Sequence, residues 1–386
     1  DPQALLAATI EALASNPRIS VRTGTEVVEV DGYVGQFRSR IRRADGQQEE
    51  VEHGVVILAT GAREVTPHEY LYGERAGVVT QRELERRLTE WARSPDAAQA
   101  ALPRRVVMIQ CVGSRDEAHP YCSRVCCTEA IKNALALKAL DPACEVTTLY
   151  RDVRSFGFKE RAYEQARRAG VVFLQYDAAQ KPVVSASGGP LAVDVAVQPE
   201  NEVFHLEADL VVLSAGIAPN ADAEAMAQRL KVPLNEDGFF LEAHVKLRPL
   251  EFAADGVYLC GMAHSPRFLD ETIAQAQGAA IRAVGLLSKN ELEATPIVAQ
   301  VNPRLCAACG LCVEVCPYGA RVLEPGAPTA EVIEVLCQGC GACITACPNK
   351  ASQQKGFEVG QLYRMLDCLY PAGPLETELV SLEQEG

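Results

Sequence analysis

Long hydrophobic runs and basic residues are both scarce in this sequence of 386 residues. No run approaches the roughly 18 uncharged apolar residues of a membrane-spanning helix, and the start, Asp1-Pro2-Gln3, lacks the pattern of a secretory signal peptide. Lys and Arg number 37 against 51 Asp and Glu, and the net charge of −14 argues against binding to nucleic acid, whose phosphates require a basic face. We therefore expect a cytoplasmic protein without a transmembrane segment, which contacts other proteins and reaches a membrane only through them.

Cysteine, in contrast, is abundant, and eight of the 15 cysteines fall in two runs near the C-terminus. Residues 306–317 and 337–348 both read C-x2-C-x2-C-x3-C-P. In this spacing three thiolates hold one iron–sulfur cubane, and the fourth, just before the proline, reaches the other cubane. The runs therefore predict two 4Fe–4S clusters with crossed ligands. One is expected on Cys306, Cys309, Cys312 and Cys347, and the other on Cys337, Cys340, Cys343 and Cys316.

Zinc and disulfides are the alternatives for these cysteines. Structural zinc sites use two C-x2-4-C pairs and have no use for a third closely spaced cysteine followed by C-P. Disulfides fit less well, because a chain with 48% apolar residues can bury a core without cross-links. We expect iron and sulfur, and a reducing compartment.

The chain before the cysteine runs has the pattern of an α/β fold. Short β-branched runs end at glycine or another small residue, as buried parallel strands do, at residues 55–62, 105–110, 210–216 and 256–261. Helical periodicity separates them, at 128–140 and 270–287. This order predicts βαβ units and a parallel sheet, which binds ligands at the carboxyl ends of its strands.

Three segments, residues 51–62, 205–220 and 255–287, resemble two-dinucleotide-domain flavoproteins of the thioredoxin reductase class. The resemblance implies FAD, with a second domain inserted into the flavin domain. The implied flavin contacts are Thr60, Gly61, Gly261, Met262, Ala263, Thr272, Ile273 and Ala274. Met262 stands where the class has Asp, and the glycine fingerprint G-x-G-x-x-G is absent from the chain. We expect that fingerprint to precede residue 1, so that the chain is a fragment or another polypeptide completes the flavin domain.

A third group of cysteines follows the strand at 105–110, where a nucleotide-binding domain would have glycines. Cys111, Cys122, Cys126 and Cys127 occupy this loop and the start of the next helix. A thiolate-rich loop can hold a cluster, whereas the close approach of a pyrophosphate needs glycine. A redox-active pair and buried apolar thiols are the other interpretations of these residues.

The motifs around this loop resemble the A subunit of heterodisulfide reductase. They are Gln110-Cys-Val-Gly-Ser-Arg-Asp116, Pro120-Tyr-Cys-Ser-Arg-Val-Cys-Cys127 and Phe156-Gly-Phe-Lys-Glu160. The resemblance covers nearly the whole chain. It implies a cubane on Cys111, Cys122, Cys126 and Cys127 beside the flavin, with Lys132 near the isoalloxazine ring. Glu83 is expected as a second contact of the flavin.

We therefore expect a partial thioredoxin-reductase-like flavoprotein followed by a two-cluster ferredoxin domain. The expected units are a first flavin-domain segment at 1–103 and an inserted Rossmann-like domain at 104–220. A returning flavin-domain segment at 221–294, the ferredoxin domain at 295–352 and a tail at 353–386 follow.

The resemblance implies an oxidoreductase component that passes electrons between FAD and three 4Fe–4S clusters, with flavin-based bifurcation as one form of this activity. Its partners would be proteins like the B and C subunits of heterodisulfide reductase, or hydrogenase-, dehydrogenase- or quinone-linked subunits, and a second copy of the chain. One alternative is an NAD(P)H-oxidising flavoprotein like the small subunit of glutamate synthase, which would need a second glycine fingerprint near residue 111. The other is an electron relay whose flavin site has decayed.

Overall fold

The structure is a computed structural model that describes residues 2–93, 102–186, 189–291 and 297–370. Its largest sheet is parallel and five-stranded, in the order β6-β13-β7-β8-β9. The strands are β6 (Val78–Thr80), β13 (Leu210–Ala215), β7 (Arg105–Val112), β8 (Glu145–Tyr150) and β9 (Val172–Gln175). The predicted strands at 105–110 and 210–216 are thus neighbours, and the parallel α/β fold is confirmed.

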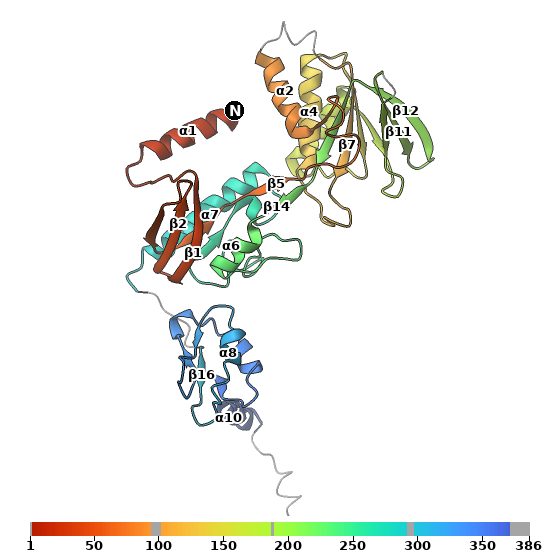
Figure 1. The fold of residues 1–386 in the computed structure, drawn as a ribbon. Coiled ribbons are helices and arrows are strands. Elements are labelled where there is room, and N and C mark those ends of the chain that lie inside the picture. The colour runs from red at the N-terminus through yellow and green to blue at the C-terminus, as the bar shows by residue number, and fades with distance from the viewer. Residues whose placement is uncertain (1, 94–101, 187–188, 292–296, 371–386) are drawn as a thin grey trace, which may run out of the picture.

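Both faces of this sheet are covered, which explains why its central strands are apolar at nearly every position. Val106 and Met108 of β7 pack against helices, whereas Val107 and Ile109 pack against a second, antiparallel sheet. The helices are α2 (Gln81–Arg93), α4 (Cys126–Leu140) and α5 (Glu160–Arg168), the last preceded by η1 (Gly157–Lys159). The second sheet consists of β10 (Val183–Ala186), β11 (Leu191–Val197) and β12 (Glu202–Ala208). In Figure 1 it lies opposite α2 and α4.

Two short strand pairs join the chain on either side of this unit. β4 (Val56–Leu58) runs parallel to β15 (Val257–Leu259), and β5 (Ala62–Glu64) pairs antiparallel with β14 (Ile217–Pro219). The predicted strand at 55–62 is interrupted, because Gly61 takes a left-handed φ of 73° and turns the chain between β4 and β5. Segments far apart in the sequence therefore form one body, and the chain between them folds into the five-stranded unit, as in a domain that is inserted into another.

The remaining elements of this body surround the two strand pairs. Its core contains Leu58, Phe240, Phe252 and Leu259, all buried. α6 (Ala223–Leu230) packs into this core, and α7 (Leu269–Leu287) follows the short helix η2 (Gly261–Ala263). An antiparallel sheet of β1 (Thr25–Tyr33), β2 (Gln36–Arg43) and β3 (Gln48–His53) and the helix α1 (Pro2–Ser15) complete it.

The C-terminal part is internally duplicated. One half contains α8 (Leu311–Glu314) and β17 (Arg321–Val322), and the other contains α9 (Ala342–Thr345) and β19 (Ser352–Gln354). β19 pairs with β16 (Ala299–Val301), and β17 pairs with β18 (Glu331–Val332), which precedes η3 (Glu334–Leu336). The helix α10 (Val359–Leu369) follows, and residues 371–386 of the expected tail lie outside the described residues (Figure 1). Within the described ranges, no helix combines the length and the hydropathy required to span a membrane.

Candidate iron–sulfur and flavin sites

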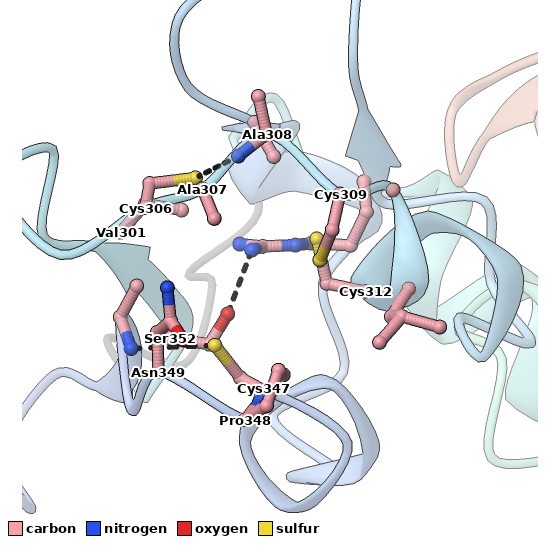
Figure 2. A pocket seen from close by; sticks show the side chains of 15 residues that line it. Val301, Cys306, Ala307, Ala308, Cys309, Cys312, Cys347, Pro348, Asn349 and Ser352 are labelled. Atoms are coloured by element: carbon pink, nitrogen blue, oxygen red, sulfur yellow. Dashed lines mark hydrogen bonds between the residues drawn. The ribbon is translucent and has the colours of Figure 1, made fainter.

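Two cavities in the C-terminal part each bring four cysteines together. The first is lined by Cys306, Cys309, Cys312 and Cys347, which Figure 2 shows around a common space. The second is lined by Cys316, Cys337, Cys340 and Cys343. These are the two crossed sets that the spacing predicts, three thiols from one run and one from the other. The cavities are also similar in size, with empty volumes of about 380 and 360 Å³.

Backbone amides point at the sulfur atoms in a repeated pattern. The N–H of Ala320 donates to Sγ of Cys316 at 3.3 Å, and the N–H of Ala351 donates to Sγ of Cys347 at the same distance. The N–H of Ala299 donates to Sγ of Cys337 at 3.3 Å. Hydrogen bonds to sulfur stabilise thiolate and help to set the reduction potential of a cluster. The donor set therefore suits an anionic iron–sulfur group.

The pKa values of two of these cysteines reflect the balance between burial and local donors. Burial opposes ionisation of Cys347, but the backbone N–H groups of Ser352, Ala351 and Asn349 outweigh it and lower the pKa of that thiol. Burial raises the pKa of Cys343, and the charge of Arg321 partly offsets the increase. A thiolate at Cys347 is thus favoured by the chain itself.

The four cysteines of the loop after β7 also lie close together. Burial raises the pKa of Cys111, Cys126 and Cys127, that of Cys127 to about 11, and the charges of other thiols in the set raise these values further. Cys111 itself adopts a left-handed φ of 62°, which turns the chain sharply at the end of the strand. Neighbouring thiols that repel one another as thiolates can be held together by cationic iron.

This cysteine loop, residues 111–127, packs against the flavin-domain body. Arg124 donates to the carbonyl oxygen of Pro266 at 3.1 Å and forms an ion pair with Glu271 at 2.7 Å. The hydroxyl of Tyr121 donates to the carbonyl of Ile217 at 2.9 Å, and the N–H of Ile217 donates to Ser123 at 2.8 Å. The loop is therefore fixed beside the start of α7.

The predicted flavin contacts lie at the carboxyl ends of β4 and β15. Because Leu58 is in register with Leu259, the segments 60–61 and 261–263 leave the two strands side by side. The N–H of Gly261 donates to Oε1 of Gln275 on α7 at 2.8 Å, and a side chain at Gly261 would meet Thr272 at 3.1 Å. Asn220 donates to the carbonyl of Thr60 at 2.7 Å. Strand ends of this kind are where open parallel sheets bind nucleotides, and FAD contact at these residues stays a prediction.

Lys132 and Glu83 have partners that the sequence interpretation did not include. Nζ of Lys132 forms an ion pair with Glu85 at 2.7 Å, and both side chains are about half exposed. Glu83 accepts a hydrogen bond from the N–H of Thr80 at 2.8 Å, while Oγ1 of Thr80 accepts one from the N–H of Glu83 at 3.3 Å. This is a capping box at the start of α2, and its T-x-x-E signature was available in the sequence. The flavin roles of both residues stay predictions.

Two partly buried acids with no sequence signal lie near these residues. Burial raises the pKa of Glu129 to about 7, and the charge of Lys132 opposes the increase. Burial also raises the pKa of Glu64, three residues after Gly61 on β5, and the nearby charge of Glu83 adds to the effect. Glu64, Glu83, Glu129 and Lys132 therefore form one interacting group beside the predicted flavin contacts.

Comparison with known proteins agrees with both halves of the chain. The family described as "4Fe-4S dicluster domain" matches residues 305–351. The chain is 38% identical over 298 residues to the A subunit of the H(2):CoB-CoM heterodisulfide,ferredoxin reductase of Methanothermobacter marburgensis, covering 73% of this chain and 44% of that protein. It is 38% identical over 288 residues to a second relative, the iron-sulfur A 2 subunit of the CoB--CoM heterodisulfide reductase of Methanopyrus kandleri, covering 70% of this chain and 43% of that protein.

Among solved structures, the thioredoxin reductase of T. acidophilum aligns with a TM-score of 0.48 and 16% identity, covering 74% of this chain and 81% of that chain. The chain spans less than half the length of the two heterodisulfide reductase relatives. The resemblance inferred from the cysteine motifs is nonetheless confirmed by their identity. The chain is a homologue of the A subunit of heterodisulfide reductase, and it carries a 4Fe–4S dicluster domain.

Proposed function

We propose that the chain is an electron-transfer component of a multi-subunit oxidoreductase, in which electrons pass between FAD and three 4Fe–4S clusters. The single observation that supports this most strongly is the pair of cavities, each lined by the four cysteines of one crossed set. Bound cubanes would supply one-electron chemistry. The residues of the chain would bind the irons, donate hydrogen bonds to sulfur and exclude water from the clusters.

The ligands of the two C-terminal clusters follow from the cavities. Cys306, Cys309, Cys312 and Cys347 would hold one cluster. Cys316, Cys337, Cys340 and Cys343 would hold the other. The amides of Ala320 and Ala351 would donate to the last cysteine of each run and favour the more negative, reduced state of the nearby cluster.

The third cluster is proposed on Cys111, Cys122, Cys126 and Cys127. Its support is the mutual electrostatic influence of these thiols and the attachment of their loop to the start of α7. FAD, proposed at residues 60–61, 261–263 and 272–274, would then lie close to this cluster. When bound, FAD exchanges electron pairs, and a neighbouring cubane removes electrons singly.

Lys132 and Glu83 are proposed to influence the flavin from the same side. Both belong to the charged group around Glu64, close to Gly61. The positive charge of Lys132 would favour the anionic reduced flavin, and its ion pair with Glu85 would moderate that effect. Glu83 would act mainly by fixing the start of α2.

The partners are proposed to be further subunits of an oxidoreductase, because the relatives are themselves named as subunits. Proteins like the B and C subunits of heterodisulfide reductase, or hydrogenase-, dehydrogenase- or quinone-linked subunits, could exchange electrons with the terminal clusters. A second copy of the chain is a further proposed partner. Flavin-based bifurcation is the more specific form of the proposal, and it predicts that a low-potential acceptor is reduced only while a high-potential acceptor is present.

Anaerobic purification of the native complex tests the proposal. We expect about twelve irons and twelve sulfides per chain, four for each cubane, together with FAD and co-purifying subunits. About eight irons with FAD would refute the third cluster. About eight irons without FAD would favour the relay alternative, and zinc in place of iron would overturn the proposal.

A further inference from the structure

The duplication of the dicluster domain identifies two equivalent positions with different residues. Aligning the C-P ends of the two runs places Arg321 opposite Ser352, each five residues after its cysteine. The structure repeats this equivalence: the residue before each one donates its N–H to sulfur at 3.3 Å, and each begins a strand, β17 or β19. A cation and a small hydroxyl residue therefore occupy the matching interior positions.

The guanidinium of Arg321 is buried and largely unpartnered. The residue is only 3% exposed. Its Nη2 donates to Oγ of Ser352 at 2.9 Å, so the two equivalent residues contact each other. Nε and Nη1 are buried and have no hydrogen-bond partner within the described part of the chain, and no described acid forms an ion pair with Arg321.

Arg321 also lines both cysteine cavities, the only residue shared by the linings of these two. A buried guanidinium without an anion is strongly disfavoured, because desolvation of the charge is not repaid. Cubanes held by thiolates are anionic, and their sulfur atoms accept hydrogen bonds. The two cavities beside Arg321 would therefore contain the anions that the protein chain does not provide.

We propose that Arg321 donates the hydrogens of Nε and Nη1 to sulfur atoms of the two dicluster-domain clusters, and that it raises the midpoint potential of both. The inference rests on the proposed clusters in these cavities. Reduction adds one negative charge to a cluster, so a fixed cation between the two sites stabilises each reduced state. It also weakens the repulsion between two reduced clusters, which makes it easier for both to hold an electron at once. Ser352 positions the guanidinium through its hydrogen bond to Nη2.

The test is a redox titration of the anaerobically prepared holoprotein, monitored by electron paramagnetic resonance. Arg321→Met keeps the apolar stem but removes the charge, and we expect both clusters to become harder to reduce by about tenfold, which is about 59 mV for a one-electron couple. Arg321→Lys keeps the charge without the planar fork, so its shift should be smaller. Arg304→Met is the matched control, since Arg304 is exposed and lines neither cavity. Its shift should be near zero because solvent screens the charge.

Unchanged potentials in an Arg321→Met protein that keeps the wild-type iron content would overturn the inference, while leaving the clusters themselves established. If the variant does not assemble its clusters, the wild-type protein with nitrogen-15 in its arginine side chains gives the second measurement. Pulsed electron paramagnetic resonance should then detect arginine nitrogen coupled to both reduced clusters, and the absence of that coupling would overturn the inference. Wild-type protein unable to hold any cubane would overturn the proposed function, and this inference with it.

Discussion

Nη2 of Arg124, in the cysteine loop, lies 2.7 Å from Oε1 of Glu271, in the first turn of α7. Glu271 also accepts a hydrogen bond from the N–H of Phe268 at 2.9 Å, so one carboxylate both caps α7 and holds the loop. The guanidinium of Arg124 in addition lies over the rings of Phe156 and Phe268. The proposed third cluster and the proposed flavin contacts on α7 are thus connected through a single residue pair.

Loss of this connection should loosen the cysteine loop. Glu271→Ala removes both the cap and the ion pair, and we expect a destabilisation of about 1–2 kcal/mol with faster proteolysis between residues 113 and 124. Asp270→Ala is the neighbouring control, because its ion pair with Lys159 is largely exposed. Equal proteolysis rates in the two variants and the wild type would contradict the proposed role of Glu271.

The third cluster can be tested by removing one of its ligands. Cys127→Ser should lose about four irons per chain while the spectrum of the dicluster domain stays intact. Cys144→Ser is the matched control, since Cys144 is buried in the helix-side core and lies outside the cysteine loop. An unchanged iron content in Cys127→Ser would count against the cluster.

Lys132 should affect the flavin through its charge. Lys132→Met is expected to lower the flavin midpoint potential, because a cation within about 4 Å can stabilise an anion by about 4 kcal/mol at an effective dielectric of 20. Glu85→Gln should act in the opposite direction, since it frees Lys132 from its ion pair. Lys138, further along the same helix and bonded to the carbonyl of Pro142, provides the control Lys138→Met. If the potentials of Lys132→Met and the wild type coincide, Lys132 does not act on the flavin.

His264 should make stability depend on pH. Its Nδ1 faces the donor groups of Arg267 and Gln275, so Nδ1 accepts and Nε2–H donates to Glu242 at 2.8 Å. Burial lowers the pKa of His264 below 6.5, the charge of Arg267 also lowers it, and the hydrogen bond to Glu242 opposes the shift. As the pH falls below 6.5, the unfolded chain binds a proton before the folded chain does, and the free energy of unfolding decreases.

The matched variant for this prediction is His264→Gln, which cannot titrate. Its free energy of unfolding should vary less than that of the wild type between pH 7.5 and the folded pKa of His264, as measured by denaturation at a series of pH values. Parallel curves for the two proteins over this range would show that His264 does not contribute.

The dicluster domain was predictable because its ligand spacing is local, so that each run of cysteines and its C-P end already implies the crossed sets. The central strands β7 and β13 were predictable for a different reason, since burial on both faces leaves an uninterrupted apolar run. The pairing of β5 with β14 depends on residues over 150 positions apart and has no local signal. The ion pair of Lys132 with Glu85 and the partial burial of Glu129 likewise depend on how α2 packs against α4. Glu83 differs, because its capping box was visible in the sequence and a flavin contact was inferred instead.

The crossed arrangement of the dicluster domain is the central claim, and a crystal structure of the anaerobic holoprotein, with irons located by anomalous scattering, tests it most directly. The account predicts that Cys347 binds an iron of the cluster held by Cys306, Cys309 and Cys312, while Cys316 binds the cluster held by Cys337, Cys340 and Cys343. A structure in which Cys316 binds the same cluster as Cys306 would contradict it.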